Sequence, residues 1–410
     1  MTSHSKIEVL AGRRIVLGVT GSIAAYKSAD LASKLTQAGA VVDVVMTEAA
    51  CRFISPLTFQ SVTGRKAYVD DDLWVEHVLH IRLGREADLI LIAPCTATTL
   101  SRLATGSGEG LLPLIALAAD CPMLVAPAMD VGMYAHAATQ ANVAVLEERG
   151  AAILGPVEGR MASGEMGLGR MLEPTSILGH VRQSLGDDGP LAGRKVIVTA
   201  GGTREPVDPV RVIANRSSGK QGYAIAQAAV DAGADVLLIS APTCLKAPVG
   251  VDVRSVETAS DMQDAVLAAV DNADVLVMAA AVADFRPADF QAEKIKRRKG
   301  VPALELERTD DILALVAKQR EKSGTPVLLV GFAAESEDLL DHARAKLDEK
   351  GLALIVANDI SQPDAGFSVD TNRVVLIGTD GGVEELPLMS KIKVAETVIA
   401  RIASLLTSTS

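Results

Sequence analysis

Aromatic side chains are scarce in this sequence of 410 residues: they make up 3% of it, against 49% for all hydrophobic residues. The core must therefore be built mainly from aliphatic and small side chains, and the 34 glycines allow close packing. Such a mixture is typical of parallel strands that are buried by helices on both faces. The composition predicts an α/β protein, and the length is sufficient for two domains of ordinary size.

Cysteine is also rare, and no two cysteines form a CxxC pair; the four are Cys51, Cys95, Cys121 and Cys244. We therefore expect free thiols in a reducing, cytoplasmic compartment. The first eight residues are polar and lack the apolar core of a signal peptide. The apolar run 111–119 stops at Asp120, and no such run reaches the length that a membrane span needs.

Basic residues are fewer than acidic ones, and the net charge is −11. An acidic chain is repelled by nucleic acid and by anionic membranes. We therefore expect small molecules, rather than a nucleic acid or a membrane, as its partners.

The two halves of the chain open on the same pattern, LAGRRIV at 10–16 and LAGRKVI at 191–197. Each is followed by a glycine-bearing turn, a helical pattern and an Ala-Gly-Ala return to a strand. This repeat predicts two doubly wound, Rossmann-like units rather than one large sheet. The run GDDGP at 186–190 is the predicted linker.

A long polar connection follows the first predicted strand of the second half, 196–198. It leads to a predicted helix at 223–232 that ends at Gly233. Ligands of open α/β sheets bind outside the carboxyl ends of the strands, where this connection lies. Its richness in Gly, Arg, Asn and Ser favours a ligand site over a mere connection.

Ser218, Gly219 and Lys220 stand where that helix should begin. Unpaired N–H groups, the helix dipole and the lysine charge all favour an anion there. The alternative is a plain N-cap, Ser217 or Ser218, followed by an exposed lysine.

The first half has its own glycine-bearing turn at 18–24, between predicted strands at 15–20 and 41–46. Glycines between a first strand and a first helix can form a phosphate cradle, although this is not a strict GxGxxG and a tight packing turn is the alternative. Two more buried strands are predicted at 88–93 and 123–126, so the segments 94–98 and 127–129 should also lie at the ligand end of the sheet.

With the HIRL motif that begins at His80, these segments resemble the flavin-dependent cysteine decarboxylases over most of residues 13–175. The resemblance implies a flavodoxin-like flavoprotein that holds FMN at a subunit contact within a trimer. The residues implied in FMN binding are Gly21, Ser22, Ile23, Thr47, Thr96, Ala97 and Thr98.

His80 is the predicted proton carrier of this half, since a histidine near neutral pKa can shuttle a proton. A lone histidine is more often structural, and His77 stands nearby without a motif of its own. The implied reaction oxidises the cysteinyl thiol of 4′-phosphopantothenoylcysteine, releases CO2 and then returns the electrons, so that the cycle is redox-neutral.

Three positions depart from the pattern of that family. Asp130 replaces an asparagine, and an ionised aspartate would repel a substrate carboxylate unless it is protonated or finds a new partner. Ser163 replaces the cysteine of many relatives and is a far weaker acid; Glu165 is a candidate replacement. The run EGLLP at 109–113 is also unusual. The flap 159–164 could instead be a flexible surface loop.

The polar connection 198–222, together with 279–284, 293–296, 331–335 and 357–359, resembles phosphopantothenate–cysteine ligase. The resemblance implies that the carboxylate of 4′-phosphopantothenate attacks the α-phosphorus of CTP, and that the amine of cysteine then displaces CMP from the acyl-cytidylate. Mg²⁺ would bridge the phosphate oxygens.

The resemblance assigns residues in several separate segments to CTP: Ser218, Gly219, Met278, Ala279, Ala280, Asp284, Lys294, Asp310, Asp311, Ile312, Leu313, Phe332, Lys346 and Lys350. Asp284 is also the candidate metal ligand. The alternatives are a solvated basic loop at Lys294, core packing for Phe332, and a solvated helix stripe for the two last lysines. Acidic residues at 310–311 would also suit a helix start.

Two residues of the polar connection are predicted to act in the ligase reaction. Asn215 could steady the acyl-cytidylate or its oxyanion, and Arg211 could pair with a substrate carboxylate or phosphate. Either could instead hold the loop through backbone hydrogen bonds.

The sequence therefore predicts a bifunctional enzyme of coenzyme A biosynthesis, with the decarboxylase at 1–190 and the ligase at 191–410. Trimers of the first half and dimers of the second would combine into a dodecamer, and 351–371 could form a lid or a dimer contact. One alternative is an active ligase whose first half binds FMN only for assembly. The other is a dinucleotide-dependent oxidoreductase, which would ordinarily carry a strict GxGxxG.

Overall fold

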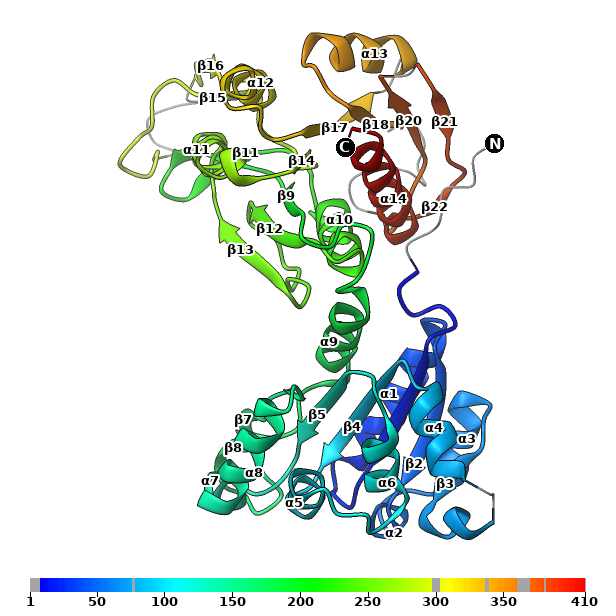
Figure 1. Ribbon diagram of the computed structural model, residues 1–410. Helices are drawn as coiled ribbons and strands as arrows, with labels where there is room; N and C mark the ends of the chain where they lie inside the picture. The colour runs from blue at the N-terminus through cyan, green and yellow to red at the C-terminus, as the bar shows by residue number, and fades with distance from the viewer. Residues whose placement is uncertain are drawn as a thin grey trace. The chain divides into compact units, whose positions relative to one another are not determined.

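The computed structural model describes residues 8–75, 78–296, 303–335, 339–359, 369–379 and 381–409 (Figure 1). The chain forms two compact units, which divide between Leu185 and Gly186, at the start of the predicted linker. Each unit is a sheet of mostly parallel strands with helices on both faces, which confirms the predicted fold class. No helix in the described ranges is both long and apolar enough to cross a membrane.

The first unit has a six-stranded sheet in the order β3-β2-β1-β4-β5-β6, and its paired strands are parallel. Its elements are β1 (Arg14–Val19), α1 (Ala25–Gln37), β2 (Val41–Met46), α2 (Glu48–Cys51), α3 (Pro56–Thr63), β3 (Ala67–Val69), the 3-10 helix η1 (Asp70–Trp74), α4 (Leu79–Glu86), β4 (Leu89–Cys95), α5 (Ala97–Thr105), α6 (Leu111–Ala118), β5 (Met123–Pro127), α7 (Val131–Ala135), α8 (Ala137–Glu148), β6 (Ala152–Ile153), β7 (Val157–Arg160), β8 (Met166–Arg170) and α9 (Pro174–Gly186).

Alternate residues of these strands enter two different cores. Leu17 of β1 packs with α1, α3 and α9, whereas Val16 packs with α4, α5, α6 and α8. Because both faces of the strands are buried, their sequences are continuous apolar runs, which is why composition alone indicates the fold. The aliphatic side chains fill both layers, and Phe59 is the one aromatic among the largest fully buried side chains.

The segment 159–164 is not simply a flexible loop. Strands β7 and β8 pair antiparallel, and the hairpin they form carries residues 161–165 at its tip. Strand β4 also differs from prediction, because it continues through Pro94 and Cys95, so Thr96 is the first residue beyond the sheet.

The second unit has an eight-stranded sheet in the order β13-β12-β9-β14-β17-β18-β20-β21, in which β20 and β21 are antiparallel to their neighbours. Its elements are β9 (Lys195–Ala200), β10 (Arg204–Asp208), β11 (Arg211–Ala214), α10 (Lys220–Asp231), β12 (Asp235–Ser240), β13 (Val251–Ser255), α11 (Ala259–Ala269), the 3-10 helix η2 (Val270–Asn272), β14 (Val275–Met278), β15 (Phe285–Pro287), β16 (Leu306–Arg308), α12 (Ile312–Ser323), β17 (Leu328–Glu335), α13 (Leu339–Glu349), β18 (Leu354–Asp359), β19 (Thr371–Asn372), β20 (Val374–Gly378), β21 (Val383–Glu385), β22 (Met389–Ser390) and α14 (Lys391–Thr409).

Two helices, α10 and α14, cover one face of this sheet, and α11, α12 and α13 contribute the core of the other face. The polar connection after β9 is not an open loop, because β10 and β11 pair within it as an antiparallel hairpin. One sequence-based boundary is also wrong, because Lys350 lies just beyond α13 rather than on the helix. Phe332 lies inside β17.

Helix α10 begins at Lys220 rather than at Tyr223, and its N-cap is Gly219 instead of Ser217 or Ser218. Gly219 has a φ of +75°, and a Cβ there would lie 2.6 Å from Cγ2 of Thr243. Only glycine fits this left-handed, crowded position without strain. Gly219 therefore allows the backbone to turn into the helix, and no side-chain hydrogen bond caps the helix.

Some predictions fall on residues outside the described ranges. They are His77, much of the proposed lid at 351–371, and the end of the basic run after Lys296.

Candidate functional site

Thr20 forms hydrogen bonds between the ends of β1 and β4, the two strands between which the first sheet reverses its order. Its side chain is buried; Oγ1 donates to the carbonyl of Pro94 at 2.7 Å and accepts from Thr96 N at 3.1 Å. Thr96 in turn caps α5 by accepting from Thr99 N. The point of strand reversal is where doubly wound sheets bind their ligands. Thr20 was not among the predicted site residues, although its place at the end of the first strand signals it.

The predicted FMN residues lie around this edge. Gly21 packs so closely on the next connection that a Cβ there would lie 2.5 Å from Cβ of Ala49. Thr47 caps α2, while Ser22 N donates to the carbonyl of Thr20 at 2.8 Å. Ile23 is 60% exposed beside them, and Ala97 and Thr98 form the first turn of α5. The structure thus brings together the turns that follow β1, β2 and β4.

His80 lies in the first turn of α4, in a half-buried position. Its Nδ1 is buried and has no hydrogen-bond partner among the residues that the structure describes. A buried polar atom without a partner is costly, and such atoms mark places where a ligand, a water or another chain completes the site. This observation fits a group bound beside His80.

Asp130 and Ser163, two of the positions that depart from the family pattern, contact each other. Asp130 follows β5 and caps α7, with Oδ1 accepting from Gly132 N at 3.2 Å. Its Oδ2 accepts from Ser163 Oγ at 2.7 Å. Ser163 is therefore a hydrogen-bond partner for the Asp130 carboxylate. The hydroxyl of Ser163 is correspondingly engaged as a donor to an anion rather than to a substrate.

The hairpin that carries Ser163 is held at its base. Met129 N donates to the carbonyl of Gly169 at 3.1 Å. Lys27, a buried residue of α1, donates to the carbonyl of Met171 and to Glu173 at 3.2 and 2.8 Å. The hydrogen bond from Lys27, although burial opposes it, lowers the pKa of Glu173. The base of the flap is thus connected to α1, the helix that follows the turn after β1.

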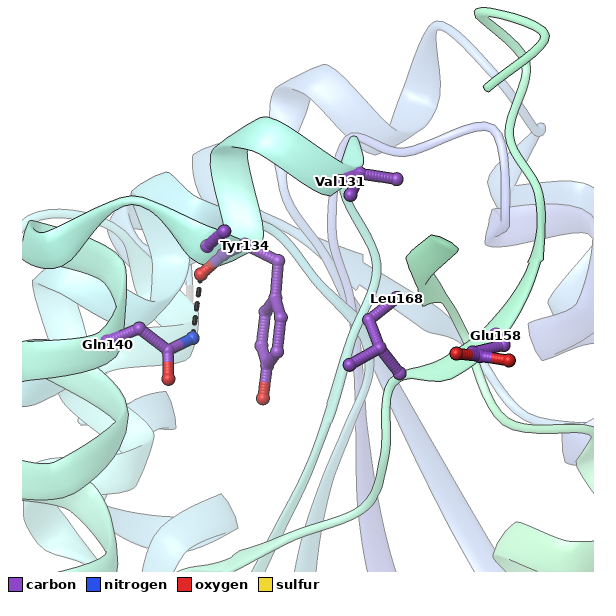
Figure 2. Close-up of a pocket in the computed structure, with 6 residues that line it drawn as sticks. Val131, Tyr134, Gln140, Glu158 and Leu168 are labelled. Carbon is purple, nitrogen blue, oxygen red and sulfur yellow. Dashed lines mark hydrogen bonds between the residues drawn. The ribbon is translucent and has the colours of Figure 1, made fainter. Parts of the chain in front are cut away.

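A pocket of ≈ 460 Å³ opens beside Asp130 and was not found from the sequence (Figure 2). Figure 2 shows the ring of Tyr134 between Gln140 and Leu168, with Val131 above and Glu158 beyond. Gln140 Nε2 donates to the carbonyl of Tyr134 at 2.7 Å and fixes one wall. The pocket lies between α7, the start of α8 and the flap hairpin, so a molecule there would contact both the flap and the residue that follows Asp130.

Thr199 plays the same part in the second unit as Thr20 does in the first. It is fully buried in β9, and its Oγ1 accepts from Ala279 N and Ala280 N, each at 3.1 Å. The sheet reverses its order between β9 and β14, so these two residues lie at the point where ligands bind. Thr199 was also not predicted, although it too stands at the end of the first strand.

Asn215 and Arg211 both hold backbone groups. Asn215 Nδ2 donates to the carbonyl of Val282 at 3.1 Å and lies 3.4 Å from that of Ala281. Arg211 donates to Asp208 at 3.0 Å and to the carbonyl of Ile295 at 3.2 Å. These contacts fit the loop-holding alternative for each residue. The roles of Asn215 and Arg211 toward substrate remain predictions.

Asp284 lies beside the start of α12. Thr309 N donates to the carbonyl of Asp284 at 3.0 Å, and Thr309 Oγ1 donates to that of Ala283 at 2.6 Å. These bonds bring Asp284 near Asp310 and Asp311. The described residues contain no group of three His, Cys, Asp or Glu side chains that could hold a metal. A single exposed carboxylate fits Mg²⁺ only where phosphate oxygens and waters supply the other ligands.

Asp311 and Lys350 form an ion pair of 2.7 Å, which joins the start of α12 to the residue after α13. Asp311 also caps α12 by accepting from Ala314 N at 3.2 Å. Burial alone would raise the pKa of Asp311, but the Lys350 hydrogen bond and the N–H of Ala314 lower it. Lys346 lies in the last turn of α13, four residues before Lys350.

We expect Asp311→Asn to destabilise the protein at pH 7 by less than about 1 kcal/mol, since the aspartate side chain is 48% exposed and solvent screens the pair. A carboxylate with a lowered folded-state pKa stabilises the fold fully above its unfolded pKa, about 4, and loses that contribution as the pH falls through the folded value. Urea unfolding should therefore show a difference at pH 7 that shrinks below about pH 4.

The neighbouring Asp310→Asn variant is the control, because it leaves the ion pair and the cap intact. If the difference between Asp311→Asn and the wild type stays constant from pH 7 to pH 3, the ion pair does not stabilise the fold.

Other predicted CTP residues are more dispersed. Lys294 is exposed. Lys220, which was predicted only to favour an anion at the start of α10, pairs with Asp370 at 2.6 Å. Phe332 packs against the core on the α10–α14 face, whereas Ile312 belongs to the core of the other face. The structure therefore does not place Phe332 with the Asp311–Lys350 pair, and its contact with a base stays a prediction.

Comparisons with known proteins cover both units. Residues 191–406 match the family described as DNA/pantothenate metabolism flavoprotein C-terminal domain, and residues 3–186 match the family described as Flavoprotein. The coenzyme A biosynthesis bifunctional protein CoaBC of Bacillus subtilis (strain 168) is 44% identical over 402 residues, or 97% of this chain and 98% of that protein. CoaBC of Mycobacterium tuberculosis (strain ATCC 25618 / H37Rv) is 45% identical over 418 residues, or 99% of each.

Among solved structures, the crystal structure of the C-terminal domain of a coenzyme A biosynthesis bifunctional protein CoaBC is 41% identical. It covers 54% of this chain and 99% of that chain, with a TM-score of 0.46. The family matches leave the dinucleotide-dependent oxidoreductase without support. Since these relatives share 44–45% of their residues over nearly the full length, the chain belongs to the family of coenzyme A biosynthesis bifunctional proteins CoaBC, enzymes with a flavoprotein decarboxylase half and a ligase half.

Proposed function

We propose that residues 191–410 join cysteine to 4′-phosphopantothenate at the expense of CTP, and that residues 1–190 decarboxylate the product with FMN to give 4′-phosphopantetheine. The observation that carries the ligase proposal is the connection 279–282, which Thr199 holds from one side and Asn215 from the other. This connection follows β14 at the reversal of the sheet, where a ligand can meet several strand ends at once.

The ligase chemistry has two displacements. A carboxylate oxygen of 4′-phosphopantothenate attacks the α-phosphorus of CTP, and pyrophosphate leaves. The amine of cysteine then attacks the acyl carbon, loses a proton and displaces CMP. Lys294, Lys346 and Lys350 would supply positive charge to the phosphates, and Asp284 would contribute to a Mg²⁺ site that screens the same oxygens. Asn215 would orient the acyl group beside the connection that it already holds.

The ligase reaction is tested by incubating the protein with 4′-phosphopantothenate, CTP and Mg²⁺ without cysteine, then adding hydroxylamine. Pyrophosphate, CMP and a hydroxamate of 4′-phosphopantothenate are expected, because the acyl-cytidylate is a mixed anhydride that hydroxylamine attacks at the acyl carbon. Consumption of CTP to CDP and phosphate would exclude this mechanism.

In the first unit, FMN would supply the two-electron chemistry that makes loss of CO2 possible. Thr20 and Thr96 order the turns that would hold it, and His80 Nδ1, which has no partner among the described residues, would hydrogen-bond the substrate. The flap hairpin would cover the substrate, with its tip beside Asp130.

The FMN assignment predicts that Gly21→Ala loses flavin. The added methyl group would lie 2.5 Å from Cβ of Ala49, so the turn that follows β1 must move. We expect the purified variant to retain less than about a tenth of the wild-type flavin absorbance, since a shift of this turn removes several hydrogen bonds at once. Gly108→Ala is the matched control, because Gly108 has no positive φ and an added Cβ would lie 3.4 Å from the nearest atom, Cδ2 of Leu114. Full flavin content in Gly21→Ala would place the cofactor elsewhere.

A second candidate function is an active ligase whose first unit binds FMN only for assembly. The Asp130–Ser163 hydrogen bond favours it, because the hydroxyl at the flap tip already donates to a carboxylate. Purified 4′-phosphopantothenoylcysteine separates the two functions. Release of CO2 supports the decarboxylase, and recovery of the unchanged compound with a flavin-loaded protein supports the assembly role.

We also propose a dodecamer built from trimers of the first unit and dimers of the second. Large apolar side chains support this, since they are exposed on both units: Ile23, Tyr26, Phe53, Leu57 and Trp74 in the first, and Val210, Val212, Phe285, Phe290 and Leu306 in the second. Single exposed apolar residues are common on monomers, whereas contiguous patches of them mark contacts between chains. These residues are therefore the candidates for such patches. Light scattering tests the assembly: a dodecamer supports the proposal, and a monomer contradicts it. A cytoplasmic location stays the prediction of the sequence.

A further inference from the structure

Asp208, the last residue of β10, is an acidic side chain with no exposed surface. A buried carboxylate is costly unless each oxygen is hydrogen-bonded. Its Oδ1 accepts from Val210 N at 2.9 Å, and its Oδ2 accepts from Ile295 N at 3.1 Å and from Arg211 at 3.0 Å. Burial would raise the pKa of Asp208, but these donors and the Arg211 charge lower it, so the group is held as an anion.

Arg211 and Asp208 together hold Ile295, which is distant from them in the sequence; we call this pair of side chains the clamp. While one nitrogen of Arg211 bonds Asp208, the other donates to the carbonyl of Ile295 at 3.2 Å. The Asp208–Arg211 pair thus holds both the N–H and the C=O of Ile295. A further backbone bond, from Gln291 N to the carbonyl of Val207 at 3.1 Å, fixes the same segment along β10.

The residues on either side of Ile295 are Lys294 and Lys296, and both are exposed. A lysine side chain is long and flexible, so the position of its ammonium group depends on where its backbone is fixed. Fixing the backbone before a ligand arrives reduces the entropy lost on binding. The clamp therefore determines where these two cations can reach.

We infer that Asp208 is a positioning residue for the ligase reaction, which acts through Ile295 to present Lys294 and Lys296 to an anionic substrate group. This inference rests on the proposed function, in which the anion is the triphosphate of CTP. Asp208 touches no substrate itself. Its contribution to binding is the fixed backbone of the basic segment.

The test compares Asp208→Asn with the wild type. The amide keeps the shape of the side chain but loses the charge that holds Arg211 and strengthens the bond to Ile295. We expect the KM for CTP to rise about tenfold, as the loss of charge-assisted bonds implies, while the KM for cysteine and the flavin content stay unchanged. An unchanged KM for CTP would overturn the inference.

Trypsin provides a readout that does not depend on catalysis. Cleavage of the Lys294–Ile295 bond, followed by mass spectrometry of the native protein, should be several times faster in Asp208→Asn, because a held backbone resists the extended conformation that a protease needs. Equal cleavage rates would show that Asp208 does not hold this segment. Should Asp208→Asn fail to fold, Arg211→Lys, which cannot reach both Asp208 and Ile295, is expected to show the same faster cleavage.

Glu205→Gln is the matched control. Glu205 is an equally buried acid of the same strand, but its Oε1 accepts from Ala259 N, at the start of α11, at 2.9 Å. We expect this variant to lower Tm without changing the KM for CTP or the cleavage at Lys294. An equal rise of the KM in both variants would mean general loosening and would overturn the inference. If the wild type consumes no CTP, the proposed function is wrong. The cleavage rates would still show whether Asp208 and Arg211 hold the segment around Ile295.

Discussion

The double variant Asp130→Asn, Ser163→Cys is expected to decarboxylate 4′-phosphopantothenoylcysteine about a hundredfold faster than the wild type. The asparagine removes a negative charge that would repel the substrate carboxylate, and its amide can donate to that carboxylate. The cysteine, with a pKa near about 8.5, is a much stronger proton donor than the serine that now bonds Asp130 at 2.7 Å. Release of CO2 in single-turnover experiments measures the effect.

The two single variants act as controls, because they separate the effect of removing the charge of Asp130 from the effect of placing an acidic thiol at position 163. Ser163→Cys alone leaves a thiol beside a carboxylate, which raises the pKa of the thiol and limits the gain. Asp130→Asn alone removes the repulsion but supplies no acid. A wild type that already matches the double variant would show that the Asp130–Ser163 pair supports full decarboxylation and that another group donates the proton.

Thr199→Val is expected to destabilise the second unit by roughly 2–5 kcal/mol and to abolish ligase activity. Valine has nearly the same shape, but it leaves the partly buried N–H groups of Ala279 and Ala280 without the acceptor that Thr199 Oγ1 provides. Each unsatisfied donor costs about 1–3 kcal/mol, which is a large fraction of the stability of a domain. Thermal unfolding and the CTP-dependent formation of pyrophosphate measure the two effects.

Thr199→Ser is the control, since it keeps the hydroxyl, and it should retain most of the activity. Flavin absorbance should be unchanged in Thr199→Val, because Thr199 belongs to the second compact unit. Wild-type stability and activity in Thr199→Val would mean that water or another group satisfies these donors, and that Thr199 does not hold the connection.

The fold could be read from the sequence because both faces of its strands are buried. The predicted strand 41–46 coincides with β2, and the paired patterns at 10–16 and 191–197 each lead into the first strand of a unit. A continuous apolar run between helical patterns has few other solutions. The hairpin of β10 and β11 was missed because its strands have only five and four residues, and because β10 is mostly polar and contains a proline.

The sites were harder to predict because their contacts join distant residues. Nothing local in the sequence shows that Asp130 meets Ser163, or that Asp208 reaches Ile295, since both contacts depend on how the sheet brings connections together. Glu205 and Asp208 are charged residues of a type that usually lies on the surface, yet both are buried. Glu205 accepts from the first N–H of α11, and Asp208 holds a distant loop. Thr20 and Thr199 stand near the ends of their strands, but the sequence does not show which distant backbone groups their hydroxyls contact.

The most direct test of the central claim supplies the purified protein with 4′-phosphopantothenate, CTP, cysteine and Mg²⁺, and identifies the products by mass spectrometry. The absorbance of the same sample reports bound flavin. We predict 4′-phosphopantetheine, with CMP, pyrophosphate and CO2 as the other products. Accumulation of 4′-phosphopantothenoylcysteine would leave the ligase and contradict the decarboxylase. If CTP remains unconsumed and neither product forms, the account of both units is wrong.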